Sequence, residues 1–491
     1  MAIKKYFSNA DNTITNAYRS NLTTRGTGSN MGLSDVLETF SIYGQESSES
    51  TELERILIKF PIDEVSQDRL NGLIPSAGSV TFYLNMYNAP NNQTTPREAT
   101  LVILPVSQSW EEGTGLDMEE YRDITRNNAG SNWINAGRSA PWTREGGDYL
   151  TSSTFSQTFP IGNEDLRIDI TSLVEEWVDG TIDNYGIGVH FTSSQEAFFS
   201  NSAGTDQNNQ LFNPSGSTNT WYTKKFFGRG SEFFFKRPTV EAVWDSSMKD
   251  DRGNFYASSS LVPASDNIRT LFLYNVIGGK LRNIPEIGTG DLRVQVYTSA
   301  SGGDQIGPTI TGGWYSKGIY TASFSLDTSA SVGYDRWYNT SLTDLYRVGQ
   351  FDIKRYGAST HNPYPNLVTS LTNLRPIYTT RESSRFRFYV RDKDWSPTIY
   401  TVATKYNDTL IIESASYQIH RIIDDLVAIP YSTGTINGTQ TSFDVSGNYF
   451  DLDFKSLAPG YSYGITLAYY DETVNSYVEQ PYEWKFRVEK V

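Results

Sequence analysis

The chain has 491 residues, and its 41 Lys and Arg against 56 Asp and Glu give a formal net charge of −15. At roughly 100–200 residues per domain, this length predicts about three domains. The acidic balance argues against binding DNA or RNA through phosphate neutralisation. The sequence contains no Cys, which excludes disulfides, thiolate zinc sites, iron–sulfur clusters and a cysteine nucleophile.

No segment predicts a leader or a membrane span. The first ten residues carry two lysines, but no apolar stretch follows them. The most apolar run, at residues 101–106 (LVILPV), is far below the roughly 20 residues that a membrane helix needs. We therefore expect synthesis in a cytoplasm and no membrane association.

Alternating apolar and polar residues predict strands from the first half onward. In residues 80–87 (VTFYLNMY), the apolar side chains at the even positions would share one face of a strand. Half-buried strands separated by Gly, Asn and Asp turns are typical of antiparallel sandwiches. The sequence therefore predicts a mainly β protein.

One segment, residues 169–180, predicts a short helix that closes one end of a sandwich. Ser172 and Glu175 fit a capping box, and Gly180 fits a C-terminal stop. The apolar stripe of this helix consists of Leu173, Val174, Trp177 and Val178.

Two irregular segments predict domain boundaries. Residues 244–253 (WDSSMKDDRG) are polar and charged and read as a linker, while residues 356–365 contain Gly, Asn and two Pro. We therefore expect three domains, at residues 1–246, 252–356 and 366–491.

The last third continues the strand pattern. Residues 385–391 (RFRFYVR) and 483–489 (EWKFRVE) alternate between apolar and charged side chains. Residues 419–429 (IHRIIDDLVAI) fit either a helix or a hairpin that turns at Asp424 and Asp425. The surrounding strands favour the hairpin.

Residues 457–463 (LAPGYSY), ahead of an alternating strand, resemble the tyrosine corner of fibronectin type III and related Ig-like sandwiches. The resemblance implies that Tyr463 hydrogen-bonds back to the connecting loop and that Leu457 fills the core.

Several blocks in the first 245 residues occur in the order expected of one known family. They are residues 11–15 (DNTIT), 55–60 (RILIKF), 109–114 (SWEEGT), 142–148 (WTREGGD), 169–171 (DIT) with Trp177, 184–186 (NYG) and 237–238 (RP). This part resembles the disaggregatase-related carbohydrate-binding-module family (DNRLRE-type domains). The resemblance implies an N-terminal jelly-roll-like antiparallel sandwich with one short helix, and we expect two Ig-like β-sandwich domains after it.

The whole chain, including residues 250–256 (DDRGNFY) and 448–453 (NYFDLD), resembles virion structural proteins of tailed phages, especially marine myovirus types. The resemblance implies a non-enzymatic protein of the virion, made in the host cytoplasm and attached to the head, neck or collar, or tail. Its partners would be other virion structural proteins in a symmetric multi-copy assembly. The alternative is a glycan-binding adhesin module that recognises host surface polysaccharide.

Aromatic and basic residues are the candidate contacts for either function, because Trp, Tyr and Arg carry interface hot spots and aromatic rings stack on sugars. These candidates are Trp110, Trp142, Trp221, Tyr222, Arg229, Trp314 and Trp395. For each of them a buried position in the core of a sandwich is the structural alternative.

Catalytic and metal sites find little support. A carboxylate cluster lies at Glu111, Glu112, Asp117, Glu119 and Glu120. Such a cluster can do acid–base work on glycosides or bind calcium, but a solvated loop is the simpler interpretation. Asp179 and Asp183 flank a turn without a complete calcium motif, and His190 fits a structural strand residue. No nucleophile elbow, zinc-protease motif or phosphate loop occurs, so we expect no catalysis, cofactor or metal.

Overall fold

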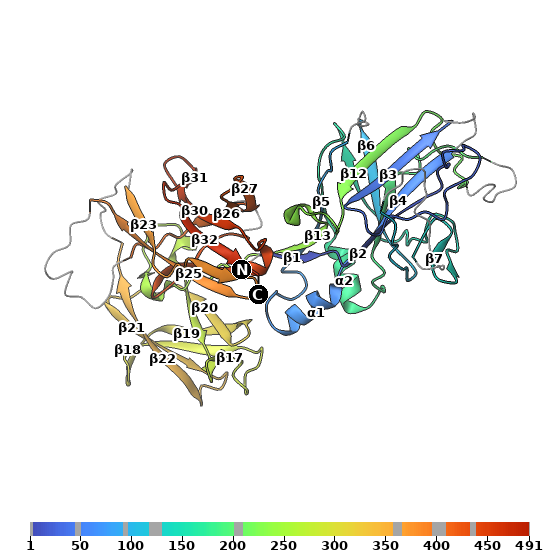
Figure 1. Ribbon diagram of the computed structural model, residues 1–491. Coiled ribbons are helices and arrows are strands. Elements are labelled where there is room, and N and C mark those ends of the chain that lie inside the picture. Colours follow the sequence, from blue (N-terminus) through green and yellow to red (C-terminus); the bar gives the residue numbers. More distant parts are fainter. Residues whose placement is uncertain are drawn as a thin grey trace. The chain divides into compact units, whose positions relative to one another are not determined.

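The computed structural model describes residues 3–44, 51–91, 97–116, 130–200, 210–356, 366–394, 409–432 and 438–490. The chain divides into two compact units, Ile3–Val243 and Trp244–Val491. Almost all regular structure is β-strand, so the predicted mainly β sandwich class is confirmed (Figure 1). Among these residues, no helix has both the length and the apolar character needed to cross a bilayer.

The first unit is an antiparallel sandwich of two sheets. The smaller sheet has the strand order β1-β13-β5-β10, and the larger has the order β12-β3-β4-β11-β6-β9 with β2 paired to β4. The strands are β1 (Ile3–Phe7), β2 (Ala10–Thr15), β3 (Val36–Tyr43), β4 (Thr51–Lys59), β5 (Thr81–Met86), β6 (Ala99–Pro105), β9 (Phe155–Phe159), β10 (Leu166–Asp169), β11 (Ile187–Phe191), β12 (Trp221–Phe227) and β13 (Thr239–Val243), with the small pair β7 (Asn135–Gly137) and β8 (Ala140–Pro141).

The alternation seen in the sequence fixes which face of β5 is buried. Phe82, Leu84 and Met86 are fully buried, whereas Thr81 and Tyr83 on the other face are half-exposed. Burying one face of each strand supplies the apolar area that holds the two layers together.

Within its described residues the first unit contains two α-helices, α1 (Ile62–Leu70) and α2 (Thr171–Asp179), where the sequence predicted one. The C-terminal stop of α2 is confirmed, because Gly180 is left-handed with φ 79°. The predicted capping box is wrong: Ile170 occupies the N-cap and Ser172 lies inside the first turn. The sequence missed α1 because it buries only Ile62 and Val65 and therefore has no apolar stripe.

The second unit begins with a single seven-stranded sheet, in the order β14-β22-β21-β18-β19-β20-β15. The strand β19 explains why one continuous sheet forms here rather than two: it pairs with β18 along its first part and with β20 along its last residues. The elements are β14 (Phe255–Tyr256), β15 (Arg269–Tyr274), β16 (Val276–Ile277), β17 (Lys280–Leu281), β18 (Leu292–Ser299), β19 (Gly302–Ser316), β20 (Ile319–Phe324), β21 (Val332–Tyr338) and β22 (Leu345–Lys354).

The rest of the second unit is a two-sheet sandwich. One sheet has the order β23-β25-β29-β28, and the other has the order β24-β32-β30-β26-β27 with β31 paired to β30. Its strands are β23 (Leu367–Leu371), β24 (Ile377–Thr379), β25 (Ser383–Asp392), β26 (Ala415–Arg421), β27 (Leu426–Ile429), β28 (Ser442–Asp444), β29 (Gly447–Asp453), β30 (Ser462–Asp471), β31 (Ser476–Glu479) and β32 (Trp484–Glu489).

Two local predictions for this sandwich are confirmed. β26 and β27 form the predicted hairpin, and Asp425 in its turn has a φ of 51°. The tyrosine corner is also present: the Tyr463 hydroxyl donates to the carbonyl of Ala458 at 2.7 Å, and Leu457 is fully buried.

Residues 244–253, predicted as a linker, belong to the second unit, and the division between the two units falls at their start. We call this segment the strap, because it runs through the core of the second unit. Met248 packs with Phe272 of β15 and Tyr449 of β29, and the backbone N–H of Asp250 donates to the carbonyl of Phe443 at 3.1 Å. Arg252 is also buried. Asp245 in the strap is exposed, but Asp250 and Arg252 are buried, and each has a hydrogen-bond partner elsewhere in the second unit.

Candidate functional site

Of the predicted contact residues in the first unit, Trp221 is the one that is mainly exposed, at 65%. It opens β12, one of the two end strands of the larger sheet, opposite Ile42 of β3. Tyr222 points to the other face, where its ring lies 5.6 Å from that of Phe191. The period-two geometry of the strand therefore separates two neighbouring aromatic residues, one turned outward and one inward.

Trp110 and Trp142 belong to the interior of the first unit. Trp142 is buried, and its indole N–H donates to the carbonyl of Asn132 at 2.8 Å. Trp110 is half-buried and donates to the carbonyl of Tyr185 at 2.7 Å. Both indoles therefore pin loops to the sandwich rather than presenting a flat ring to a ligand.

In the second unit, Trp314 of β19 is 39% exposed, and its indole N–H donates to Asn283 Oδ1 at 3.2 Å. Its neighbour Tyr315 is exposed to a similar degree. Trp395 lies outside the described residues.

Arg229 takes part in an ion-pair cluster. Its guanidinium lies 2.8 Å from Glu112 Oε1, and its backbone N–H donates to the buried carboxylate of Asp11. Burial raises the pKa of Asp11 to about 6, against the opposing effect of Arg229. The cluster joins three segments that are far apart in sequence, so Arg229 has a structural partner already.

The carboxylate cluster of the sequence is only partly described. Glu111 Oε2 accepts from the backbone N–H of Gly130 at 3.2 Å and of Arg138 at 3.3 Å, so this carboxylate organises a loop. Asp117, Glu119 and Glu120 lie outside the described residues. Within the described part of the chain, no group of three or more His, Cys, Asp or Glu side chains is placed to hold a metal ion.

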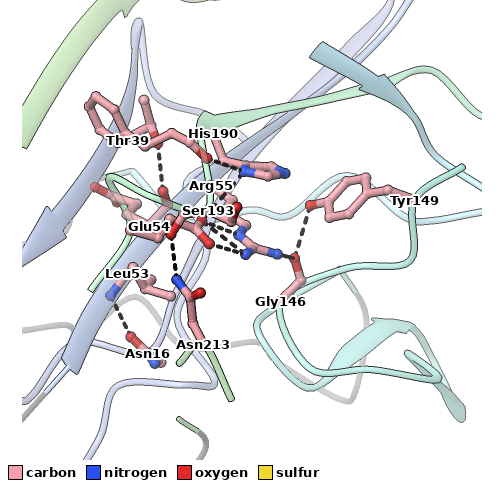
Figure 2. Close-up of polar contacts among 12 residues, drawn as sticks. Asn16, Thr39, Leu53, Glu54, Arg55, Gly146, Tyr149, His190, Ser193 and Asn213 are labelled. Carbon is pink, nitrogen blue, oxygen red and sulfur yellow. Dashed lines mark hydrogen bonds and ion pairs between the residues drawn. The ribbon is translucent and has the colours of Figure 1, made fainter. Parts of the chain in front are cut away.

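A buried polar network in the first unit centres on Arg55 of β4 (Figure 2). Its guanidinium binds both carboxylate oxygens of Glu196, with distances from 2.8 to 3.0 Å, and donates to the carbonyl of Gly146 at 3.1 Å. It also lies 5.6 Å from the ring of Trp133. Both charges are almost entirely buried, so each depends on the other for its solvation.

Tyr149 and His190 complete this network. The Tyr149 hydroxyl donates to the same Gly146 carbonyl at 2.9 Å, and its ring lies 5.4 Å from that of His190. Burial, together with the nearby Arg55, lowers the pKa of His190 to about 4. The folded unit therefore holds a neutral imidazole. The pKa of a histidine in the unfolded chain is about 6.5. Between pH 6.5 and 4 the unfolded chain therefore binds a proton that the folded chain does not, so the free energy of unfolding decreases as the pH falls through this range.

Glu54 is the neighbour of Arg55 along β4, and it points to the opposite face of the strand. Its side chain is buried, and neither carboxylate oxygen has a hydrogen-bond partner among the described residues. The contact drawn from Thr39 in Figure 2 reaches the backbone carbonyl of Glu54, at 2.7 Å. Burial raises the pKa of Glu54 well above its usual value, and Glu38 adds to this effect.

We expect Glu54→Met to stabilise the first unit by about 1–3 kcal/mol at neutral pH, because it removes an unpaired buried acid. The pKa of Glu54 is higher in the folded chain than in the unfolded chain, where it is near 4. Glu54 therefore lowers the free energy of unfolding of the wild type as the pH rises above about 4. The advantage of the variant should therefore shrink toward pH 4. Urea unfolding curves between pH 4 and 8 measure it, and a variant that is less stable at every pH would contradict this account.

The sequence analysis did not predict the buried polar contacts of Arg55 and Glu54, although the sequence of β4 contains one indication of them. All of β4 except its last residue is buried, yet the strand contains Glu52, Glu54 and Arg55. Charged residues inside an otherwise apolar run indicate a buried ion pair, since unpaired charges are too costly there. The partner Glu196 was not identifiable from the sequence.

Comparison with known proteins gives little further information. No protein-family model matches the chain. No curated protein matches it either. Among solved structures, trypsin-activated alpha-2-macroglobulin from Escherichia coli matches with a TM-score of 0.16 and 10% identity, over 92% of this chain and 30% of that chain. The chain thus spans less than a third of that protein, and so low a TM-score supports no conclusion about either fold or function.

Proposed function

We propose that the chain is a non-enzymatic structural protein of a tailed-phage particle that acts through protein–protein contacts. The sequence resemblance to tailed-phage virion proteins suggests this role. The observation that carries it in the structure is the position of Trp221, 65% exposed at the start of an end strand of its sheet. Residues 87–89 pair with β12 at Lys225–Phe227, so the proposed contact lies at the Trp221 end of the strand. Trp is among the residue types enriched at interface hot spots.

The interior chemistry supports the same role. The ionisable groups of the Arg55 network pair with one another inside the first unit, and Arg252 pairs with Asp335 inside the second. Such pairs fix one arrangement of the strands around them. A domain with a fixed interior and contact residues at its surface suits a multi-copy assembly. In such an assembly the free energies of many modest contacts combine into a high overall avidity.

The test is incorporation of Trp221→Ala into particles. Loss of a hot-spot side chain weakens a contact by 2 kcal/mol or more, which is about 30-fold in affinity. Quantitative mass spectrometry of purified particles should therefore find far fewer copies of Trp221→Ala. Ile423→Ala, which alters an apolar residue 78% exposed in the second unit, serves as the matched control and should incorporate normally. Equal copy numbers for both variants would contradict the proposed contact.

A glycan-binding role is the second candidate, and one observation favours it. Lys225 shares a face of β12 with Trp221, and its Nζ lies 3.0 Å from Glu38 Oε2 of β3, whose other oxygen accepts from the buried hydroxyl of Thr223 at 2.8 Å. A flat ring beside ammonium and carboxylate groups is a combination that can stack on and hydrogen-bond a sugar. A glycan array with the full chain tests this role: binding that Trp221→Ala abolishes supports it, and the absence of binding rejects it.

A further inference from the structure

A buried lysine amine lies against a side-chain amide in the first unit. Lys224 of β12 is 2% exposed. Its Nζ donates to Asn88 Oδ1 at 2.7 Å, to the carbonyl of Gly162 at 2.9 Å and to the carbonyl of Glu164 at 2.7 Å. The amine is thus held in a fixed position next to the carboxamide of Asn88.

The backbone sets this position. Asn88 lies opposite Phe226 in an antiparallel bridge, and the bridge is flanked by two hydrogen bonds of 3.0 Å, from Phe227 N–H to the Tyr87 carbonyl and from Ala89 N–H to the Lys225 carbonyl. Lys224 is therefore a diagonal cross-strand neighbour of Asn88 on the same face, within reach of a long side chain.

Burial of the amine favours its neutral form, whereas two ring faces beside it favour the ammonium. The rings of Phe159 and Phe226 lie 4.6 and 5.2 Å from Nζ. Burial lowers the pKa of Lys224 to about 8, and Glu164 and Asp165 oppose this shift in part. A substantial fraction of the amine is therefore unprotonated in mildly alkaline solution, and an unprotonated lysine is a nucleophile.

We propose that Lys224 and Asn88 join in an intramolecular isopeptide bond. The lone pair of Nζ attacks Cγ of Asn88, the bond from Cγ to Nδ2 breaks, and Nδ2 leaves as ammonia with a proton taken from Nζ. One amide replaces another, so no oxidant, reductant or co-substrate is needed.

The geometry suits this reaction. Oδ1 is about 1.2 Å from Cγ, so a hydrogen bond from Nζ to Oδ1 leaves Nζ within about 4 Å of the carbon that it attacks. Asn88 Nδ2 points away from Lys224 and donates to the Ala89 carbonyl at 3.2 Å. Asn88 is half-exposed, so ammonia can reach solvent. Asp165 Oδ1, which accepts from the Asn88 N–H at 2.7 Å, supplies a carboxylate beside the reacting groups.

The bond would link positions 136 residues apart. It would tie β12, at the edge of the larger sheet, to the segment that follows β5 of the smaller sheet. In a chain without cysteine, it would supply the covalent closure that disulfides give many extracellular proteins. This inference does not depend on the proposed function.

Mass spectrometry of the full chain tests the proposal. After incubation of the folded protein at mildly alkaline pH, the intact mass should be lower than the sequence mass by one ammonia. Succinimide formation at an asparagine gives the same mass change, so the tryptic digest decides. We expect a branched peptide in which the segment containing Asn88 is joined to the segment containing Lys224, with no cleavage after Lys224.

The controls separate the reaction from folding. Lys224→Arg and Asn88→Ala should each abolish both the mass loss and the branched peptide. Lys225→Arg, which alters the next residue on the opposite face of β12, should keep both. A folded wild-type chain that retains its full mass and is cleaved after Lys224 would overturn the proposal and leave Lys224 as a buried ammonium with three hydrogen bonds.

Discussion

Replacing Arg55 by methionine is expected to lower the free energy of unfolding of the first unit by about 3–5 kcal/mol, because the buried carboxylate of Glu196 then loses its guanidinium partner and keeps only the imidazole of His190, 3.4 Å away. The two side chains are only 8% and 9% exposed, so water cannot take the place of the lost partner. Urea unfolding followed by tryptophan fluorescence measures the change, since Trp133 lies next to the guanidinium.

Two controls define this prediction. The double variant Arg55→Met with Glu196→Met should recover much of the lost stability, because an apolar pair replaces an ion pair at little net cost. Arg144→Met, at an exposed position in the first unit, should change stability by no more than about 0.5 kcal/mol. If Arg55→Met costs no more than Arg144→Met, the ion pair is not the element that holds these loops to the sheet.

Arg252→Met is expected to have an effect of similar size on the second unit, about 3–5 kcal/mol. Arg252 binds both oxygens of Asp335 at 2.5 and 2.9 Å, and Asp335 is fully buried. The indole N–H of Trp337 donates to the same carboxylate. The substitution therefore leaves the buried carboxylate of Asp335 with one hydrogen-bond donor fewer on each oxygen. It also removes the ion pair that joins the strap to β21.

The stability difference between the wild type and Arg252→Met should also depend on pH. Arg252 helps to hold the pKa of Asp335 below its usual value despite burial. The stabilisation from this pair is therefore present above the unfolded pKa near 4 and is lost as the pH falls below it. Wild type and Arg252→Met should converge in acid, as measured by thermal unfolding between pH 3 and 7. Arg347→Met, on the exposed end of β22, is the control, and a pH-independent difference would contradict the account.

The parts of the fold that were predictable depend on neighbours in sequence. Alternation identified strands such as β5, and the stripe with Gly180 identified α2. For residues 419–429 the local pattern fitted a helix or a hairpin, and the surrounding strands favoured the hairpin that β26 and β27 form. The signals for β5 and α2 each lie within a dozen residues, where strand or helix geometry alone decides which side chains share a face.

The strap shows why the rest could not be predicted. A polar segment normally lies in solvent, and Arg252 of the strap is buried with Asp335 as its partner, 83 residues away. The same holds for Arg55 and Glu196, which are 141 residues apart. Long-range partners decide whether a charge is inside or outside, and a single sequence does not reveal them.

The sequence likewise did not reveal which candidate contact residues are exposed. Trp142, Trp110 and Trp221 all stand beside polar or charged residues in the sequence. What separates them is the acceptor for the indole N–H, and that of Trp110 is the carbonyl of Tyr185, 75 residues away. Exposure, which decides whether a ring can act as a contact, thus becomes visible only in the folded unit.

Antibody labelling of purified tailed particles that carry this chain, viewed by negative-stain electron microscopy, tests the proposed role most directly. We expect label at one fixed level of the particle, in several copies around it. Label that remains in the soluble fraction of the lysate, with none on intact particles, would contradict the proposal.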